Sequence, residues 1–293
     1  MRANILRARF FPPPAQLAGC FTSFYLLEVD LAEGESVADH VHPEWANLRF
    51  FSGLPPVVET SDGVVLRDAS FVVTGPSSRA MGFRMTATRM WGIGLLPLGW
   101  AKFMDVPARV MADSVSDGMT DPLYAAFAAL CGRLSRSAPD AEEQARTICD
   151  FFLERDRPVR HGALIYAVNQ ALVDPDVHSA AALASHAGVT QRTVERLCAR
   201  YFGFSPQLLV RRQRMMRTLS AFMLAERSNW SAVIDCHYTD HAHFTREFHC
   251  FMGMSPTEYA LAEHPILAAF MAERTRILGS PVQVLDRPDG QSP

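Results

Sequence analysis

The residues best suited to recognition chemistry are polar ones spaced for one face of a helix. Arg192 and Arg196 lie four positions apart with Glu195 between them, and Gln191 and Arg200 extend the same set. Arginine can donate two hydrogen bonds to O6 and N7 of guanine, and glutamate can accept one from N4 of cytosine. The other face would hold apolar residues at positions i, i+3 and i+4, namely Val194, Leu197 and Cys198. This spacing predicts contact with nucleic acid bases from one exposed helix face.

Positive charge is concentrated around this segment. The chain of 293 residues has a net charge of −3, but between Thr190 and Arg217 seven arginines stand against one acid, Glu195. Four of these arginines lie beyond the helix that holds Arg192 and Arg196, namely Arg211, Arg212, Arg214 and Arg217. Such a local excess suits a surface that faces phosphates, and we expect Arg211 and Arg212 to contact DNA. The alternative is an ordinary solvated helix face.

A second group of residues could bind a metal. His40, His42 and Glu44 follow Gly34 and resemble part of a cupin metal motif. However, Glu44 lies too close to His42, and the second half of such a motif is missing from the sequence. We therefore predict no metal here, and interpret the segment as a strand edge or a turn.

Zinc-type ligands gather in a third segment, as Cys236, His237, His241, His243, His249 and Cys250. Their spacings match no common zinc site, so no metal is predicted. The cysteines form no CxxC pair and are expected to be reduced thiols. GxSxG, Walker-type and GxGxxG motifs are absent from the sequence. We predict no catalytic residues and no cofactor.

The elements that position these residues are duplicated. Gly203-Phe204-Ser205-Pro206 returns as Gly253-Met254-Ser255-Pro256, and each closes a run that reads as a short helix, a turn and a second helix. Gly188 supplies the first turn, and Thr190 is a plausible N-cap for the helix that follows it. Two such units in tandem indicate a pair of helix-turn-helix motifs.

A long helix would join the two units. It begins with Ser205 as N-cap and Pro206 at its first position and extends over residues 206–226, about 30 Å at 1.5 Å per residue. That length would place the second helix of each unit in successive major grooves on one face of DNA. In the second unit, the turn holds His237 where the first has Gly188, and the outward residues are His241, Ala242, Thr245 and Arg246.

At this level of detail residues 170–262 resemble the DNA-binding domain of AraC/XylS-type transcriptional regulators. The resemblance lies in His237-Tyr238-Thr239-Asp240, then Phe244, Arg246 and Phe248, then the closing Gly253-Met254-Ser255-Pro256. His237 and Met252 replace the Gly and Phe of the family's signature. The resemblance implies base contacts by Arg192, Glu195 and Arg196, and by His241, Ala242, Thr245 and Arg246. It also implies an N-terminal domain that senses a ligand or dimerises.

The predicted organisation is an α+β multidomain chain. A β-rich, cupin-like sensory or dimerisation domain (1–112) precedes a helical connector (113–170). An all-α double helix-turn-helix domain (171–265) follows, and then a C-terminal helix and tail (266–293) that is expected to be disordered from Ser280. Strands are predicted at 21–31, 45–51, 64–73 and 82–95, and a linker at 113–122. Aromatic residues could line a ligand cavity or simply form the core: Phe24, Tyr25, Trp45, Phe50, Phe71, Phe83, Trp91 and Trp100.

We therefore expect a cytoplasmic regulator that is not an enzyme, since no apolar run reaches membrane-spanning length and the N-terminus lacks a signal-peptide core. Its expected partners are double-stranded DNA, a small-molecule effector, RNA polymerase and a second copy of the chain; activation is the expected mode. Two alternatives stay open: a cupin-like metal enzyme fused to a DNA-binding module, and a DNA-architectural protein without sequence preference.

Overall fold

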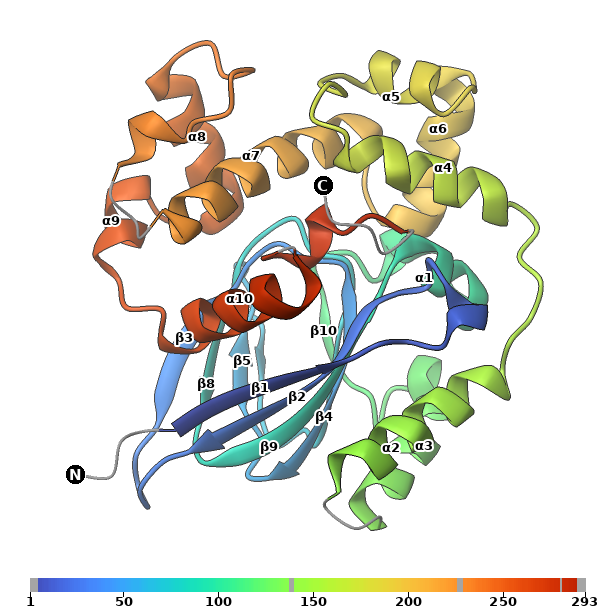
Figure 1. The fold of residues 1–293 in the computed structure, drawn as a ribbon, viewed down its shortest axis with the longest axis vertical. Coiled ribbons are helices and arrows are strands. Elements are labelled where there is room, and N and C mark those ends of the chain that lie inside the picture. Colours follow the sequence, from blue (N-terminus) through green and yellow to red (C-terminus); the bar gives the residue numbers. More distant parts are fainter. Residues whose placement is uncertain (1–4, 137–139, 226–228, 280, 289–293) are drawn as a thin grey trace.

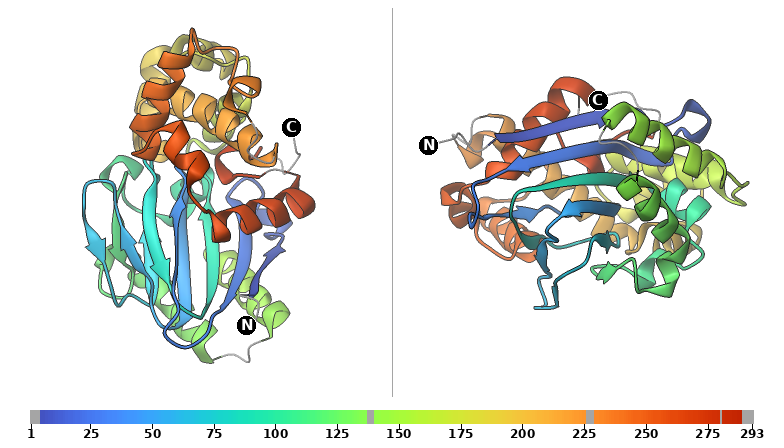
Figure 2. Two further views of the ribbon diagram at one scale, coloured as in Figure 1. Left: turned by 90° about the vertical axis from the view of Figure 1, so that its left-hand side faces the viewer. Right: turned by 90° about the horizontal axis from the view of Figure 1, so that it is seen from below.

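The computed structural model describes residues 5–136, 140–225, 229–279 and 281–288. Strands make up most of the N-terminal part, and helices the C-terminal part (Figure 1). Turned on its side, the molecule shows the helices of the C-terminal part gathered at one end of the β-rich part (Figure 2). The predicted α+β organisation, a β-rich domain followed by a helical one, is confirmed.

Two antiparallel sheets form the β-rich domain. The larger has the strand order β1 (Ile5–Phe11), β2 (Phe21–Asp30), β9 (Thr88–Leu95), β4 (Ala46–Gly53), β7 (Phe71–Thr74) and β10 (Val115–Asp117). The smaller has the order β3 (Val37–Val41), β8 (Met81–Met85), β5 (Val57–Glu59) and β6 (Val65–Leu66). Leu27 and Val72 of the larger sheet share a buried cluster with Val58 and Met85 of the smaller one. The sheets therefore face each other across a common apolar interior.

Two strands of the larger sheet were not predicted. β1 pairs with β2 along its whole length, from Ile5 opposite Asp30 to Phe11 opposite Phe24. β10 lies inside the predicted linker 113–122 and pairs with β7. The prediction of a linker is therefore wrong for Val115–Asp117, because hydrogen bonds to β7 hold these residues in the sheet. The sheet thus continues past residue 112.

Helices pack against one face of the larger sheet. They are η1 (Ala15–Leu17), α1 (Pro97–Phe103), η2 (Ala108–Val110), η3 (Pro122–Tyr124), α2 (Ala125–Arg136) and α3 (Ala141–Leu153). Phe127, Phe151 and Phe152 of α2 and α3 pack into one cluster with the sheet residues Phe24 and Trp91. Asp140 caps α3, since its side chain accepts a hydrogen bond from the backbone of Glu143. These helices cover one face of the sheet and leave its other face to the apolar interior.

Most of the remaining helices lie in the predicted helix-turn-helix region, 171–265, and α4 begins before it, in the predicted connector. They are α4 (Gly162–Val173), α5 (Ala180–His186), α6 (Gln191–Leu197), the π-helical turn η4 (Cys198–Phe202), α7 (Pro206–Leu224), η5 (Trp230–Ala232), α8 (His241–Met252) and α9 (Pro256–Leu261). Thr190 caps α6 and Ser205 caps α7, as predicted. The repeated glycines Gly203 and Gly253 take φ values of +89° and +71°, which end the preceding helix without a Cβ penalty.

Helix α7 is the spine of this region. Its 19 residues extend over about 28 Å at 1.5 Å per residue, with α6 near one end and α8 near the other (Figure 1). Trp230 anchors the far end: its ring stacks on Phe222 of α7 at 3.6 Å between centroids and contacts Phe244 and Phe248 of α8. Aromatic packing of this kind holds α8 against α7.

The chain then returns to the β-rich domain. Helix α10 (Pro265–Leu278) lies against β1 and β3 (Figures 1 and 2), where Phe270 contacts Phe10 and Tyr25 edge to face. The 3-10 turn η6 (Gln283–Leu285) follows. The prediction of disorder from Ser280 is wrong for residues 281–288. Gln283 is buried, and its Oε1 accepts a hydrogen bond from Asn47 Nδ2 at 3.0 Å, which ties this segment to the β-rich domain. Ser280 and residues 289–293 lie outside the described residues.

Among the described residues, none of the helices is both long enough and apolar enough to cross a membrane.

Candidate nucleic-acid interface and buried cavity

Helix α6 presents the predicted recognition face to solvent. Val194 and Leu197 are buried, which orients the helix. The polar residues predicted for the other face are all exposed: Gln191, Arg192, Glu195, Arg196 and Arg200, the last in η4. Gly188 takes a φ of +66° in the turn before α6, as the sequence predicted. No ion pair joins Arg192 to Glu195 in the described part of the chain, so both side chains are available to a partner.

Arg211 does not stand free at the surface. Its Nε donates to Glu247 Oε1 at 2.6 Å, and Arg214 donates to both oxygens of the same carboxylate. Glu247 belongs to α8 and its side chain is 2% exposed. Two arginines of α7 therefore tie α8 to the spine. Arg211, with a side chain that is 40% exposed, can reach a phosphate only from its outer edge.

Arg212 contradicts its prediction as a DNA contact. It is fully buried, facing the β-rich domain, where it donates to the carbonyl oxygens of Ser77 and Glu44 at 3.0 and 3.4 Å. Its guanidinium lies 4.1 Å from the ring centroid of Trp45, a cation–π geometry. Adjacent residues of a helix point about 100° apart, so Arg211 and Arg212 cannot share one exposed face.

In the second unit, the helix that was predicted to contact DNA forms as α8, but the predicted supporting helix does not form. In place of a first helix beginning at Ala232, the described residues hold only the 3-10 turn η5. Asp240 caps α8, and His241, Ala242 and Arg246 are exposed. Thr245 is half-buried and donates back to the carbonyl of His241 at 2.9 Å. The outward set predicted from the sequence is thus brought together on α8.

His237 does not need the left-handed backbone that Gly188 adopts. The residues other than glycine with positive φ, within the described ranges, are Asp68 and Asp113. Instead, Asp235 organises this turn by accepting from the backbone N of His237 at 3.0 Å and from Arg217 Nε at 2.8 Å. A carboxylate that accepts nearby backbone and arginine donors replaces the glycine.

A groove of about 530 Å³ separates the two units. It is lined by His178, Ser179, Ala180, Gln207, Val210, Arg211, Arg214 and His243. His178 stacks on His237 with 5.0 Å between ring centroids, so the first and second units touch directly. Residues of α7 form the floor of the groove, and its arginines Arg211 and Arg214 are both paired with Glu247.

Residues 183–262 match the family model of a helix-turn-helix domain, of the AraC type. This match supports the resemblance of the segment to the DNA-binding domain of AraC/XylS-type regulators. The match covers the turn before α6, the spine α7 and helix α8. It includes each predicted base-contacting residue of both units.

Solved structures similar to this chain include two of ToxT and one of CuxR. ToxT from Vibrio cholerae is 10% identical, with 77% of this chain and 97% of that one covered at a TM-score of 0.45. ToxT bound to an unsaturated fatty acid is 9% identical, with 89% and 97% covered and a TM-score of 0.40. The AraC-like transcriptional activator CuxR is 14% identical, with 78% and 91% covered and a TM-score of 0.29. No curated protein sequence matches the chain.

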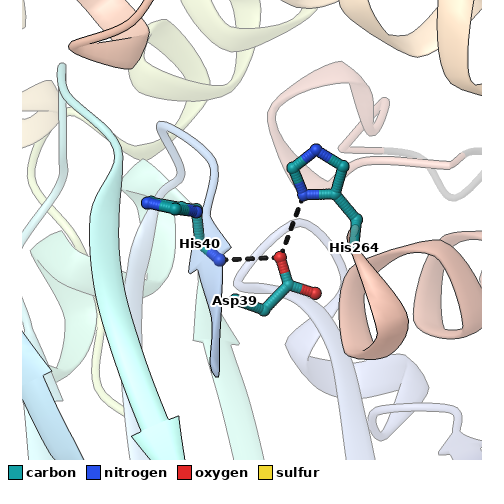
Figure 3. A group of neighbouring side chains, drawn as sticks. All are labelled: Asp39, His40 and His264. Carbon is teal, nitrogen blue, oxygen red and sulfur yellow. Dashed lines mark hydrogen bonds and ion pairs between the residues drawn. The ribbon is translucent and has the colours of Figure 1, made fainter. Parts of the chain in front are cut away.

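The residues of the cupin-like motif do not meet. His42 Nε2 shares a 2.7 Å hydrogen bond with the Tyr259 hydroxyl, whereas Glu44 accepts from Arg49 at 2.5 Å. His40 lies instead beside Asp39 and His264, the group drawn in Figure 3. One ring nitrogen of His40 lies within 4.8 Å of a ring nitrogen of His264, and Asp39 Oδ1 accepts from His264 Nδ1 at 3.1 Å. Both oxygens of Asp39 accept protein donors, so the group serves to hold α10.

The second cluster of zinc-type ligands is dispersed in the same way. Of its members, Cys236 and His237 lie together with Asp235. His243 instead contacts Thr239, and His241 contacts Thr245. Asp235 already accepts from Arg217 and from the backbone of His237. The arrangement serves the turn before α8.

A cavity of about 100 Å³ lies between the two sheets of the β-rich domain and α10. Of the aromatic residues proposed for a cavity, Tyr25 and Phe83 line it; Phe24, Phe50, Phe71, Trp91 and Trp100 pack in the core against α2 and α3, and Trp45 packs against the helical domain. Sequence reasoning missed the other side of the cavity, which Ile266, Leu267, Phe270 and Gln283 supply. These residues are more than 170 positions from the last lining strand, so no local pattern signals their role.

The charged groups at the polar end of the cavity are Arg49 and Glu44, which form a buried ion pair. Burial raises the pKa of Glu44, and the paired Arg49 acts in the opposite direction. Burial works to lower the pKa of Arg49, but the attraction of Glu44 and Tyr25 raises it above its ordinary value. Arg49 therefore stays protonated, and the pair as a whole is neutral when Glu44 is ionised.

His42 should make the free energy of unfolding depend on pH. Burial lowers its pKa to about 3, against about 6.5 in the unfolded chain. The unfolded state therefore takes up the proton first, so this contribution is complete above pH about 6.5 and is lost as pH falls toward 3. Between pH 6 and 4 we expect a loss approaching about 1.4 kcal/mol per pH unit from this residue.

Urea unfolding of the wild type and His42→Gln across pH 7 to 4 measures that contribution. Glutamine can still hydrogen-bond the Tyr259 hydroxyl but takes up no proton in this range. The variant should show a shallower fall in unfolding free energy with acid. Identical slopes for the two proteins would rule out His42 as the source.

Proposed function

We propose that this protein is a sequence-specific DNA-binding transcriptional regulator that uses α6 and α8 in successive major grooves. The observation that carries the proposal is the exposed polar face of α6, held by buried Val194 and Leu197 within a matched helix-turn-helix domain. In the first unit the proposed contacts are Gln191, Arg192, Glu195, Arg196 and Arg200, with Arg211 beside the phosphates. In the second they are His241, Ala242, Thr245 and Arg246. Arg212 is left out because it is buried.

The two units should contribute unequally. α6 exposes two arginines and a glutamate that can read base edges, whereas α8 exposes His241, Ala242 and one arginine, Arg246. Direct readout depends on such donors and acceptors, so α6 should supply most of the discrimination between bases. α8 should add affinity, chiefly through Arg246.

Hydroxyl-radical footprinting tests the two-unit arrangement. A fragment selected from genomic DNA by the full-length protein should show two protected segments one helical turn apart, about 10 base pairs, on one face of the duplex. Arg246→Ala should weaken protection of one segment and keep the other. A single protected segment with the wild type would mean that α8 does not enter a groove.

Regulation by a small molecule is part of the proposal. A largely apolar cavity with a few polar groups is the kind of site that binds small ligands. Its wall includes residues on both sides of the DNA-binding domain in sequence. A homodimer, contact with RNA polymerase, activation of transcription and a cytoplasmic location fit a regulator of this kind. The alternative of a metal enzyme loses its motif, because His42 and Glu44 bind Tyr259 and Arg49 instead.

A further inference from the structure

The cavity in the β-rich domain has one polar end, built on Arg49. Its Nη2 donates to Glu44, its Nη1 to Thr74 at 3.0 Å and its Nε to the Tyr25 hydroxyl at 3.2 Å. The Arg49 and Glu44 side chains are only 11% and 10% exposed. Since the ion pair has no net charge, an anionic or cationic ligand would leave a buried charge without a partner, which is costly. A neutral hydroxyl or amide can donate to the carboxylate and accept from the guanidinium.

The rest of the cavity is apolar and requires an apolar ligand body. Strands of both sheets supply aliphatic, aromatic and thioether side chains, namely Leu27, Val41, Phe51, Val58, Val72, Met81, Phe83, Met85 and Met90. Methionines suit a site that adapts its shape to a ligand. The combination of apolar walls and one neutral polar end fits a small amphipathic molecule.

Helix α10 forms one wall of the cavity, where it lies against β1 of the larger sheet and β3 of the smaller one. Ile266, Leu267 and Phe270 line it, and Phe270 contacts the ring of Tyr25 at the polar end with 4.9 Å between centroids. α10 follows α9 of the DNA-binding domain after three residues, Ala262 to His264. A molecule in the cavity would therefore touch an element joined directly to the second helix-turn-helix unit.

One residue of the β-rich domain holds the beginning of α10. Asp39 Oδ2 accepts from the backbone N of Ile266 and Leu267 at 3.0 and 2.9 Å, and Asp39 Oδ1 accepts from His264 (Figure 3). A carboxylate at the first turn of a helix satisfies backbone donors that otherwise have no partner. Here the carboxylate comes from another domain, so its loss would loosen α10 from the strands.

We propose that the cavity binds a small neutral amphipathic molecule, with its hydroxyl or amide group between Arg49 and Glu44. Helix α10, as the closing wall, transmits occupancy of the cavity to α8 and α9. This inference rests on the proposed function, since DNA binding is the output that the ligand regulates. Binding of such a molecule changes the position or mobility of α10, and the link through His264 changes the presentation of α8 to DNA.

Methyl NMR on full-length protein labelled with [¹³C-methyl]methionine tests the site. The probes are 1-hexanol, hexanoate and hexylammonium at pH 7, which share one apolar chain and differ in charge. 1-Hexanol should shift the methyl signals of Met81, Met85 and Met90, and each charged probe should bind at least tenfold more weakly. No shift with any probe would overturn the site, and tighter binding of hexanoate would overturn the neutral head group.

A pair of variants shows where the probe binds. Val58→Phe adds volume inside the cavity and should abolish the shifts caused by 1-hexanol. Val110→Phe adds the same volume at a position that is 57% exposed and should leave them unchanged. Equal shifts in both variants would place the probe elsewhere and overturn the assignment.

Hydrogen–deuterium exchange without DNA tests the role of α10. Asp39→Asn and 1-hexanol should each change exchange in α10 and α9 by at least threefold, and should change the affinity for a specific DNA fragment by at least threefold. Altered exchange without altered affinity would overturn the coupling. Failure of the wild type to prefer any DNA would instead contradict the proposed function, because the NMR and exchange results do not depend on DNA.

Discussion

Replacing Arg196 with glutamate should weaken specific DNA binding by about a hundredfold or more while leaving the fold intact. Arg196 is exposed on α6, and its removal takes away a bidentate base contact that is worth about 1–3 kcal/mol of discrimination. The new carboxylate adds repulsion from the phosphates. Because the side chain is exposed and has no ion-pair partner among the described residues, unfolding should change by no more than about 0.5 kcal/mol.

Fluorescence anisotropy and urea unfolding on the same preparations measure both quantities. Arg146→Glu is the matched control, since Arg146 is exposed on α3, outside the helix-turn-helix domain, and the charge change is identical. It should keep binding within about threefold of wild type. If Arg196→Glu binds as the control does, α6 is not the recognition helix.

Replacing Glu247 with alanine should lower the free energy of unfolding by about 3 kcal/mol. Glu247 is 2% exposed and accepts from Arg211 and from both Arg214 Nε and Nη2. Removal of one partner of a buried ion pair leaves the other charge unpaired, and breaking such pairs costs about 3–5 kcal/mol; we take the lower end because Arg211 is 40% exposed and can turn to water.

Urea unfolding monitored by tryptophan fluorescence measures this loss, since Trp230 packs on α8. Glu247→Gln keeps the shape and some of the hydrogen bonds and should be less destabilising. Glu263→Ala removes a carboxylate from an exposed position between α9 and α10 and should stay within about 0.5 kcal/mol of wild type. A loss below about 1 kcal/mol for Glu247→Ala would show that the two arginines do not depend on this carboxylate.

Local patterns predicted most of the helical elements and the face of α6. Val194 and Leu197 set that face by their spacing, and Thr190 and Ser205 marked helix starts through hydrogen bonds to nearby residues. Such signals lie within one or two turns of the chain. They are therefore readable without knowledge of the tertiary fold.

Features that depend on contacts between residues far apart in the sequence could not be predicted from local patterns. Arg212 is one residue from Arg211 in an arginine-rich run, yet it is buried because α7 packs that face on Trp45 and Ser77. The second unit ends in a glycine, Gly253, as the first ends in Gly203, but a turn organised by Asp235 stands in place of its predicted supporting helix. The wall of the cavity comes from α10, and its anchor Asp39 lies 225 residues from His264.

The central claim, that the protein reads DNA sequence, is tested most directly by fluorescence anisotropy with DNA from around its own gene and with scrambled DNA, across a salt series. We predict a preference for the native fragment of about 4 kcal/mol or more, as is typical of specific regulators, together with a steep loss of affinity as salt rises. Equal affinity for both DNAs at every salt concentration, with the same steep salt dependence, would contradict this account and favour a DNA-architectural protein.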